Sequence, residues 1–302
     1  MINELVIVSG KGGTGKTSLT AAFSALAKGT VLCDADVDAA DMHLLMQPKI
    51  CQTTDFMGGG QACVDPQVCT QCGTCRDVCR FGAIDETFTV QPILCEGCGV
   101  CVDMCPEKAI GFEPQKCGEW YLSDCKYGPM VHARLGIAEE NSGKLVSLVR
   151  KEARNLAEQK GYGLILTDGP PGIGCPVIAS LSGATALLIV VEPTVSGIHD
   201  MLRVAELASH FKLPGMLCIN KFDLNPEMSD KIADIGQKHN MPVVGRIPFD
   251  SSFVQAMVAG QNIFEYQPES QLSKTIQKIW TQIIGSPAMN SMGVLDLQST
   301  IR

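Results

Sequence analysis

Residues 10–17 of the chain read GKGGTGKT, after the short apolar run Leu5–Val8 and before a helical pattern over residues 16–28. The glycine spacing followed by Lys-Thr is the Walker A form, which is far more restrictive than the dinucleotide-type glycine spacing that the same residues also match. Glycines let backbone N–H groups turn towards phosphates at the N-terminus of the following helix, where anions are favoured. The stretch therefore predicts a phosphate-binding loop in which Lys16 neutralises the phosphates and the Thr17 hydroxyl ligates magnesium.

Apolar runs alternate with helical patterns through most of the chain. Strands that alternate with helices imply a mainly parallel sheet covered by helices on both faces, so the expected fold is an α/β P-loop NTPase. Further strands are expected at Val31–Cys33, Leu164–Thr167, Ala186–Val191, Met216–Ile219 and Val243–Val244. We expect this domain to be discontinuous, over residues 1–57 and 116–285, with a loose C-terminal tail over residues 286–302.

Two copies of one cysteine spacing interrupt the alternation. Both follow C-x2-C-x2-C-x3-C, the bacterial ferredoxin pattern, and flanking residues repeat with the same period of 26. In that pattern three thiolates of one run and the fourth of the other hold each cubane, so the ligand sets should cross. The expected ligands of one 4Fe-4S cluster are Cys69, Cys72, Cys75 and Cys105, and those of the other are Cys95, Cys98, Cys101 and Cys79. Residues 58–115 are therefore predicted to form an inserted two-cluster ferredoxin domain.

Two other uses of cysteine fit these runs less well. Zinc sites take four ligands in two pairs, whereas these cysteines come as triplets with an outlying fourth. Disulfide frameworks belong to small secreted chains, but this chain has 302 residues and no apolar signal segment after Met1. We therefore expect the protein in a reducing cytoplasm.

The overall charge and hydropathy limit the classes of partner that the sequence suggests. The net charge is -8, the pI is about 5.2, and no run of Lys or Arg occurs, which argues against nucleic acid as the main partner. No stretch approaches eighteen consecutive apolar residues, so no membrane-spanning helix is expected.

Lys11 is an addition that an ordinary phosphate-binding loop does not need. Residues 11–17 read KGGTGKT, which resembles the signature of the deviant Walker A ATPases of the MinD, ParA and nitrogenase iron protein group. The resemblance implies that Lys11 crosses to the phosphates of a partner subunit, in a homodimer or a heterodimer with a related ATPase. It also implies that Asp36 positions the attacking water, with Asp34 behind it near magnesium, and that Asp168 holds magnesium through water. The expected catalytic residues are Lys11, Lys16, Asp36 and Asp168.

Recognition of the base has two interpretations. Residues 220–223 read NKFD, which is literally the guanine motif of GTPases, with Asp223 accepting from the base. The resemblance implies instead that Asn220 contacts adenine, with help from the loop Ile247–Asp250, and we favour ATP because Lys11 belongs to an ATPase group. The expected nucleotide contacts are Gly10, Lys11, Gly12, Gly13, Thr14, Gly15, Lys16, Thr17, Ser18, Asn220, Lys221, Pro248 and Asp250.

The chain is most similar, to about residue 285, to MinD-superfamily ATPases that carry an inserted ferredoxin domain. Residues 132–135 (HARL), 141–146 (NSGKLV) and 172–178 (GIGCPVI) carry this narrower resemblance. It implies ATP hydrolysis in which dimer switching is coupled to electron transfer through two 4Fe-4S clusters to an acceptor protein. Two alternatives stay open: an ATPase that assembles or delivers iron-sulfur or other metal clusters, and a GTPase or kinase fused to a ferredoxin.

Several cysteines lie outside the two runs. Cys33 and Cys218 fall inside apolar strands and are expected to be core residues. Cys175, just past the Asp168 segment, is expected to be either a structural thiol or a ligand of an additional interfacial metal site. Cys117 and Cys125, at the exit of the insertion, are the other candidates for extra ligands or redox thiols. His132 is most simply a surface histidine or a satisfied core histidine.

Overall fold

The computed structural model describes residues 2–136 and 142–290, which fall into two compact units. The first unit is built from the chain up to Thr53, from Trp120–Arg134 and from Ser142 onward, and the second is centred on Thr54–Glu119. The insertion predicted over residues 58–115 lies within the second unit. Asn141 of the NSGKLV stretch lies outside the described residues.

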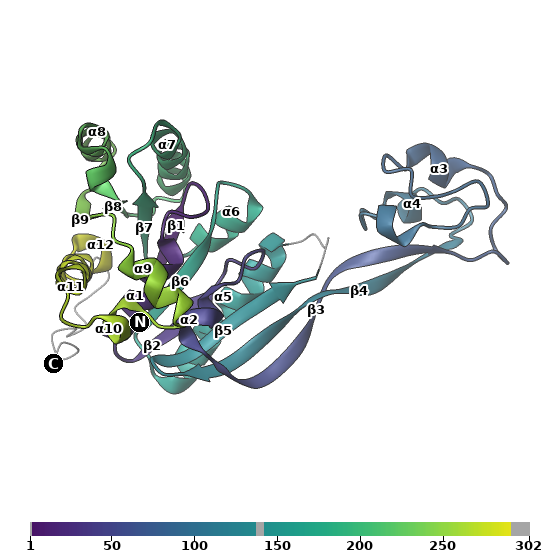
Figure 1. Ribbon diagram of the computed structural model, residues 1–302. Coiled ribbons are helices and arrows are strands. Elements are labelled where there is room, and N and C mark those ends of the chain that lie inside the picture. The colour runs from purple at the N-terminus through teal and green to yellow at the C-terminus, as the bar shows by residue number, and fades with distance from the viewer. Residues whose placement is uncertain (1, 137–141, 291–302) are drawn as a thin grey trace. The chain divides into compact units, whose positions relative to one another are not determined.

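A sheet of nine strands, in the order β3-β4-β5-β2-β6-β1-β7-β8-β9, organises the first unit (Figure 1). Adjacent strands from β5 to β9 pair in parallel: β5 with β2, β2 with β6, β6 with β1, β1 with β7, β7 with β8, and β8 with β9. The prediction of a mainly parallel α/β sheet is thus confirmed. The strands are β1 (Asn3–Ser9), β2 (Thr30–Asp34), β3 (Lys49–Val64), β4 (Ile110–Cys125), β5 (Gly128–Leu135), β6 (Leu164–Pro171), β7 (Ala186–Val191), β8 (Gly215–Asn220) and β9 (Val243–Ile247).

Helices cover both faces of this sheet, because alternate residues of a strand point to opposite faces. Leu5 and Ile7 of β1 belong to one core cluster, while Val6 and Val8 belong to another. The helices of the first unit are α1 (Lys16–Leu26), α2 (Met42–Met46), α5 (Ser142–Lys160), α6 (Cys175–Leu181), α7 (Val195–His210), α8 (Pro226–Lys238), α9 (Ser252–Val258), α10 (Ile263–Tyr266), α11 (Gln271–Ile284) and α12 (Pro287–Asn290), with the 3-10 turn η2 (Phe222–Leu224).

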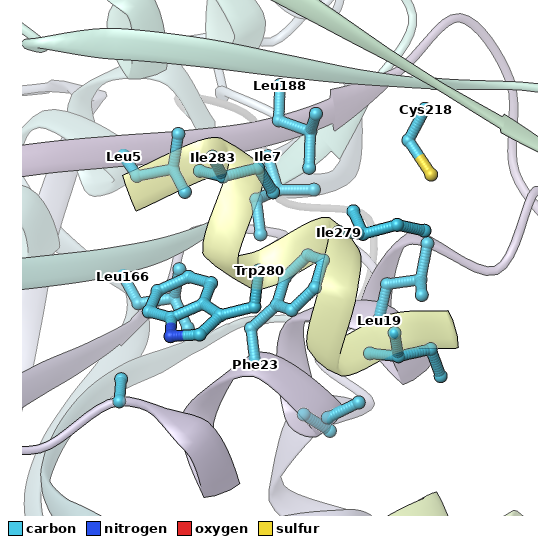
Figure 2. Packing of buried hydrophobic residues seen from close by; sticks show 14 of the residues in the cluster. Leu5, Ile7, Leu19, Phe23, Leu166, Leu188, Cys218, Ile279, Trp280 and Ile283 are labelled. Carbon is cyan, nitrogen blue, oxygen red and sulfur yellow. The ribbon is translucent and has the colours of Figure 1, made fainter. Parts of the chain in front are cut away.

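Helix α11 packs against the sheet through the apolar face that its sequence pattern predicts. Its apolar residues recur at helical spacing, and Ser270 caps its first turn by accepting from the backbone N–H of Ser273. Figure 2 shows Trp280 of α11 stacked on Phe23 of α1, with ring centroids 5.3 Å apart, beside Leu5 and Ile7 of β1. Burying side chains of this size stabilises the fold by about 1.5–3 kcal/mol each.

The end of the first unit differs from expectation. We expected a loose tail from residue 286, but residues 287–290 form α12, and Met289 is buried against the α11 core. The side chain of Asn3 also lies within hydrogen-bond distance of the Met289 carbonyl, at 3.5 Å. The domain therefore continues past residue 285, and residues 291–302 of the expected tail lie outside the described part of the chain. None of the helices within residues 2–136 and 142–290 combines the length and apolar character that crossing a membrane requires.

The second unit contains both cysteine runs. Long strands β3 and β4 lead into and out of it, and between them lie α3 (Thr74–Val78), η1 (Pro92–Leu94) and α4 (Val100–Asp103). Ile84 and Val90 form an antiparallel bridge, and the small core contains Ala62, Cys75, Ile84, Cys101 and Ile110. The predicted insertion begins at residue 58, the first of the three glycines at 58–60, and these glycines lie inside β3.

Candidate functional site

The glycine-rich loop connects β1 to α1, as its motif predicts. Gly13 and Gly15 have φ angles of 79° and 87°, a region that favours glycine, and Gly15 stands at the N-terminus of α1. The loop borders a cavity of about 380 Å³, a size typical of small-molecule sites. The predicted residues that line it are Gly12, Gly13, Thr14, Gly15, Lys16, Thr17, Ser18, Asp36, Asn220, Lys221, Pro248 and Asp250.

Three predicted side chains converge on one ion-pair cluster within this site. Lys16 Nζ lies 3.2 Å from Asp36 Oδ2 and 3.1 Å from Asp168 Oδ2. The Thr17 hydroxyl donates to the same oxygen of Asp168 at 2.7 Å. The parallel register brings the carboxylates together, since Asp34 of β2 pairs with Asp168 of β6. Buried Thr20, absent from the sequence prediction, donates to the other oxygen of Asp168 at 2.8 Å.

Burial and the neighbouring charges shift the pKa values of the residues in this cluster. Burial by itself lowers the pKa of Lys16, but the carboxylates, with Asp168 foremost, outweigh it and raise that pKa, so the ammonium stays protonated. Burial, and then the charge of Asp168, raises the pKa of Asp34 well above its usual range. Asp34 Oδ1 accepts from the backbone N–H of Asp36 at 3.3 Å, while its buried Oδ2 has no hydrogen-bond partner among the described residues. Burial also raises the pKa of Asp36, against the opposing effect of Lys16.

Lys11 and Gly10 occupy a different position from the rest of the loop. Both line a small neighbouring cavity together with Glu192, the residue that follows β7. Lys11 Nζ lies 3.6 Å from Glu192 Oε2 and 3.4 Å from the Ser196 hydroxyl. Within one chain the signature lysine is therefore paired with a carboxylate that the sequence motif did not reveal.

The NKFD segment contacts the phosphate loop. The Asn220 side-chain amide donates to the Thr14 carbonyl at 2.7 Å, and Lys221 Nζ donates to the Gly13 carbonyl at 3.2 Å. Asp223 Oδ1 accepts from the backbone N–H of Phe249 at 2.6 Å, and Asp223 is absent from the described residues that line the 380 Å³ cavity. The carboxylate that a guanine motif would use is thus bound within its own chain.

Sequence reasoning missed the apolar part of the cavity wall. Helices α2 and α9 supply most of it, and Phe249 of the Pro248 loop adds to it. Apolar spacing after that loop was the sequence signal for α9. The residues are Leu44, Leu45, Phe249, Phe253, Val254 and Met257.

The eight cysteines of the second unit gather in two groups of four. One small cavity is lined by Cys69, Cys72, Cys75 and Cys105, and a second by Cys79, Cys95, Cys98 and Cys101. Each group takes three cysteines from one run and the fourth from the other.

Backbone amides also point at some of these sulfurs. The N–H of Ala83 lies 3.4 Å from Cys79 Sγ, and that of Ala109 lies 3.3 Å from Cys105 Sγ. Within residues 2–136 and 142–290, no three His, Cys, Asp or Glu side chains are grouped so that they could hold one metal ion. Thiolates at the corners of a cubane bind different irons, so they need not converge on one point.

The remaining cysteines and His132 occupy varied surroundings. Cys33 and Cys218 are buried, as expected of core residues, and burial raises the pKa of Cys218 to about 12. Cys175 is exposed at the start of α6. Buried His132 bonds through Nε2 to Ser123 Oγ at 2.9 Å, and desolvation lowers its pKa to about 4. His132 is therefore a satisfied, neutral core histidine.

Comparison with known proteins places this site in a family. The chain is 31% identical over 287 residues to the uncharacterized protein MJ0578 of Methanocaldococcus jannaschii, covering 94% of this chain and 97% of that protein. It is 24% identical over 292 residues to MJ0547 of the same organism, a protein named as ATP-binding, with 95% and 89% covered.

Among solved structures, MinD of Pyrococcus horikoshii in complex with Mg-ADP is similar in fold. Its TM-score is 0.58 at 17% identity, over 94% of this chain and 97% of that one. A chain of the MinC:MinD cell division protein complex of Aquifex aeolicus gives a TM-score of 0.56 at 21% identity, over 94% of this chain and 96% of that one. Residues 5–263 match the family described as the CobQ/CobB/MinD/ParA nucleotide binding domain. The chain belongs to this family.

Proposed function

We propose that the protein is an ATP-hydrolysing iron-sulfur protein in which nucleotide-dependent dimer switching is coupled to electron transfer through two 4Fe-4S clusters. The observation that carries the proposal is the presence, in one chain, of two four-cysteine groups and a phosphate-loop cavity with a buried Lys16–Asp36–Asp168 cluster. ATP as the nucleotide is supported by the similarity to MJ0547, which is named as an ATP-binding protein, and to MinD of Pyrococcus horikoshii, whose structure is a complex with Mg-ADP.

The nucleotide half of the mechanism follows from the charges at the loop. Lys16, held protonated by its carboxylate neighbours, would neutralise charge that develops on the phosphates. The donor set of the Thr17 hydroxyl and the Asp168 carboxylate suits Mg²⁺, which prefers oxygen ligands and would supply charge neutralisation at the phosphates. Asp36, at the same cluster, would orient the attacking water.

Dimerisation enters the proposal through Lys11. Its side chain lies in the neighbouring cavity, away from Lys16 and Thr17, so a role at the phosphates of a second subunit fits its position. A cation supplied in trans stabilises transition-state charge as an arginine finger does. The partner would be a second copy of this chain or a related ATPase.

The donor chemistry of the second unit fits iron-sulfur clusters. Each four-cysteine group offers four thiols, and thiolates are the ligands that hold 4Fe-4S clusters. Bound clusters would supply one-electron carriers. N–H groups directed at Cys79 and Cys105 would stabilise negative charge on those sulfurs. Because such sites need reduced thiols, we propose the cytoplasm as the location and a redox protein as the acceptor.

A second candidate function is the assembly or delivery of metal clusters. The observation that favours it is exposed Cys175, which lies just after the Asp168 segment at the start of α6. Electron transfer needs only the eight cysteines already grouped, whereas delivery needs additional ligands, which Cys175 or the cysteines at the exit of the second unit, Cys117 and Cys125, would supply.

Redox titration of the protein with and without Mg-ATP tests the coupling. We expect ATP to shift the cluster potentials or the rate at which an acceptor is reduced. If neither changes, coupled electron transfer is wrong. Replacing Cys175, Cys117 and Cys125 together by serine separates the two candidates, because electron transfer should survive the change and cluster delivery should not.

The Lys11→Ala variant tests the trans assignment. We expect this change to abolish ATP turnover while nucleotide binding is largely retained, because Lys11 lies outside the 380 Å³ cavity. Lys16→Ala is the matched control, and it should weaken nucleotide binding itself. Unchanged turnover in Lys11→Ala would contradict the proposed dimer mechanism.

A further inference from the structure

The two cysteine groups of the second unit come from a sequence repeat, so corresponding positions can be compared directly. The first group is Cys69, Cys72, Cys75 and Cys105, and the second group is Cys79, Cys95, Cys98 and Cys101. Burial matches position by position, because each run has one exposed cysteine, one buried cysteine and two of intermediate exposure. The N–H groups of Ala109 and Ala83 donate to corresponding sulfurs, at 3.3 and 3.4 Å. A donor that only one group possesses would therefore make the two bound clusters different.

The hydroxyl of Thr74 is such a donor. It lies 3.5 Å from Cys72 Sγ. A cysteine that binds iron is a thiolate, which can only accept, so the hydroxyl donates in the loaded protein. Val100 stands 26 residues later, at the corresponding position of the second run, and its side chain has no polar atom. The local backbones agree, since Thr74 opens α3 after Gly73 with a φ angle of 85°, and Val100 opens α4 after Gly99 with a φ angle of 73°.

Other differences between the groups are small or act in the same direction. The backbone N–H of Gln71 lies 3.4 Å from the first sulfur of the first group, which adds a second donor there. One glutamate lines each cavity, Glu107 in the first group and Glu96 in the second. One arginine directly follows a cysteine of each group, Arg76 in the first and Arg80 in the second. Hydrogen bonding therefore distinguishes the groups more clearly than these charges do.

We propose that the Thr74 hydroxyl raises the reduction potential of the cluster bound by the first group above that of the cluster bound by the second. This inference rests on the proposed function, in which both groups hold 4Fe-4S clusters. Reduction adds negative charge that the thiolates share, and a donor at a thiolate stabilises this charge, so the potential rises. An electron on the cluster of the second group therefore passes to that of the first. This step oxidises the one cluster and reduces the other, and no proton is taken up.

The expected size follows from the net contribution of one hydrogen bond, which changes an equilibrium by roughly two- to tenfold. A tenfold change corresponds to about 59 mV for a one-electron couple. Removing the hydroxyl should therefore lower the potential of the first cluster by roughly 20–60 mV.

Reciprocal variants of the full-length, cluster-loaded protein test the inference without nucleotide. Potentials are measured by reductive titration followed by electron paramagnetic resonance. Thr74→Val keeps the shape of the side chain and removes the hydroxyl, so it should lower the higher of the two potentials. Val100→Thr supplies a hydroxyl at the corresponding position, so it should raise the lower potential. An unchanged potential in either variant, or a shift in the opposite direction, overturns the inference. If Thr74→Val fails to retain its clusters, Val100→Thr alone decides.

Single-cluster variants show which potential belongs to which group. Cys105→Ser removes a ligand of the first group, so the cluster that remains should have the lower potential. Cys79→Ser removes a ligand of the second group, so its remaining cluster should have the higher potential and should respond to Thr74→Val. The reverse assignment overturns the inference.

Thr74→Ser is the matched control, because it keeps the hydroxyl and loses only a methyl group. It should retain the wild-type potentials. A potential as low in Thr74→Ser as in Thr74→Val would assign the effect to packing and overturn the inference.

Failure of the proposed function gives a different result. A wild-type protein that holds no iron and no acid-labile sulfide after reconstitution would contradict both proposals. If the clusters bind but Mg-ATP changes neither their potentials nor the reduction of an acceptor, the coupling fails and the Thr74 effect remains. If the clusters bind and Thr74→Val leaves both potentials unchanged, only the Thr74 inference fails.

Discussion

Replacing Arg150 by methionine should destabilise the first unit more than any surface substitution. Arg150 of α5 binds both carboxylate oxygens of Glu4 in β1, at 2.7 and 2.8 Å, and the Glu4 side chain is 1% exposed. Its Nη1 also donates to the carbonyls of Ala179 and Ser182, at 2.6 and 2.7 Å. The variant would leave a buried carboxylate and two carbonyls without their main donor.

The magnitude follows from these contacts. Breaking one side of a buried ion pair costs about 3–5 kcal/mol, because the remaining charge is left uncompensated. Thr167 and Arg154 still donate to Glu4, at 2.9 and 3.1 Å, which favours the lower end of that range. We expect the free energy of unfolding to fall by about 3 kcal/mol. Urea titration followed by the fluorescence of the two buried tryptophans, Trp120 and Trp280, measures it.

The double variant Arg150→Met with Glu4→Leu is the control. Removing both partners leaves no buried charge, so most of the lost stability should return. A loss below about 1 kcal/mol in Arg150→Met would refute the reasoning, because that is the value of an exposed pair. A double variant no more stable than the single one would assign the loss to packing.

Three further predictions concern the clusters, pH and the base. Cys105→Ser should lose about half of the iron and leave the same residual electron paramagnetic resonance signal as Cys69→Ser; a match to Cys95→Ser would contradict the crossed sets. The folded pKa of His132 is about 4, below the ordinary 6.5, so the unfolded chain binds the proton first as the pH falls. The contribution of His132 to stability should be constant above about pH 6.5 and decrease by about 3 kcal/mol towards pH 4, so the decrease in urea titrations of His132→Gln should be smaller by this amount. Asp223→Asn should change the preference for ATP over GTP by less than about twofold in competition binding, whereas a large change would mean that Asp223 contacts the base.

Local signals with a fixed spacing predicted most of the site. The phosphate loop could be predicted because its glycines, Lys16 and Thr17 are adjacent in sequence. The order of the strands indicated that Asp36 and Asp168 would lie beside this loop, and both contact Lys16. The grouping of the cysteines could also be predicted from a fixed spacing, since each run supplies the fourth cysteine of the other group.

Long-range contacts account for what was missed. Glu192 belongs to no motif. Its contacts with Lys11 and Lys221 form only in the folded chain, where β7, β8 and the loop after β1 are adjacent. The residues that form β3 show no clear alternation, so neither its length nor the inclusion of the glycines at 58–60 was expected. Met289 seemed part of a tail because its burial depends on the α11 core, which lies outside its own sequence neighbourhood.

The exchange of the fourth cysteine between the two runs also bears on the origin of the second unit. Each small cavity is completed by Cys79 or Cys105, which comes from the opposite half of a 26-residue repeat. A peptide with one run would present three cysteines to one cavity and donate its fourth elsewhere. An ancestral single repeat could complete both sets only by pairing with a second copy of itself. Tandem duplication would then have made an intermolecular exchange permanent within one chain.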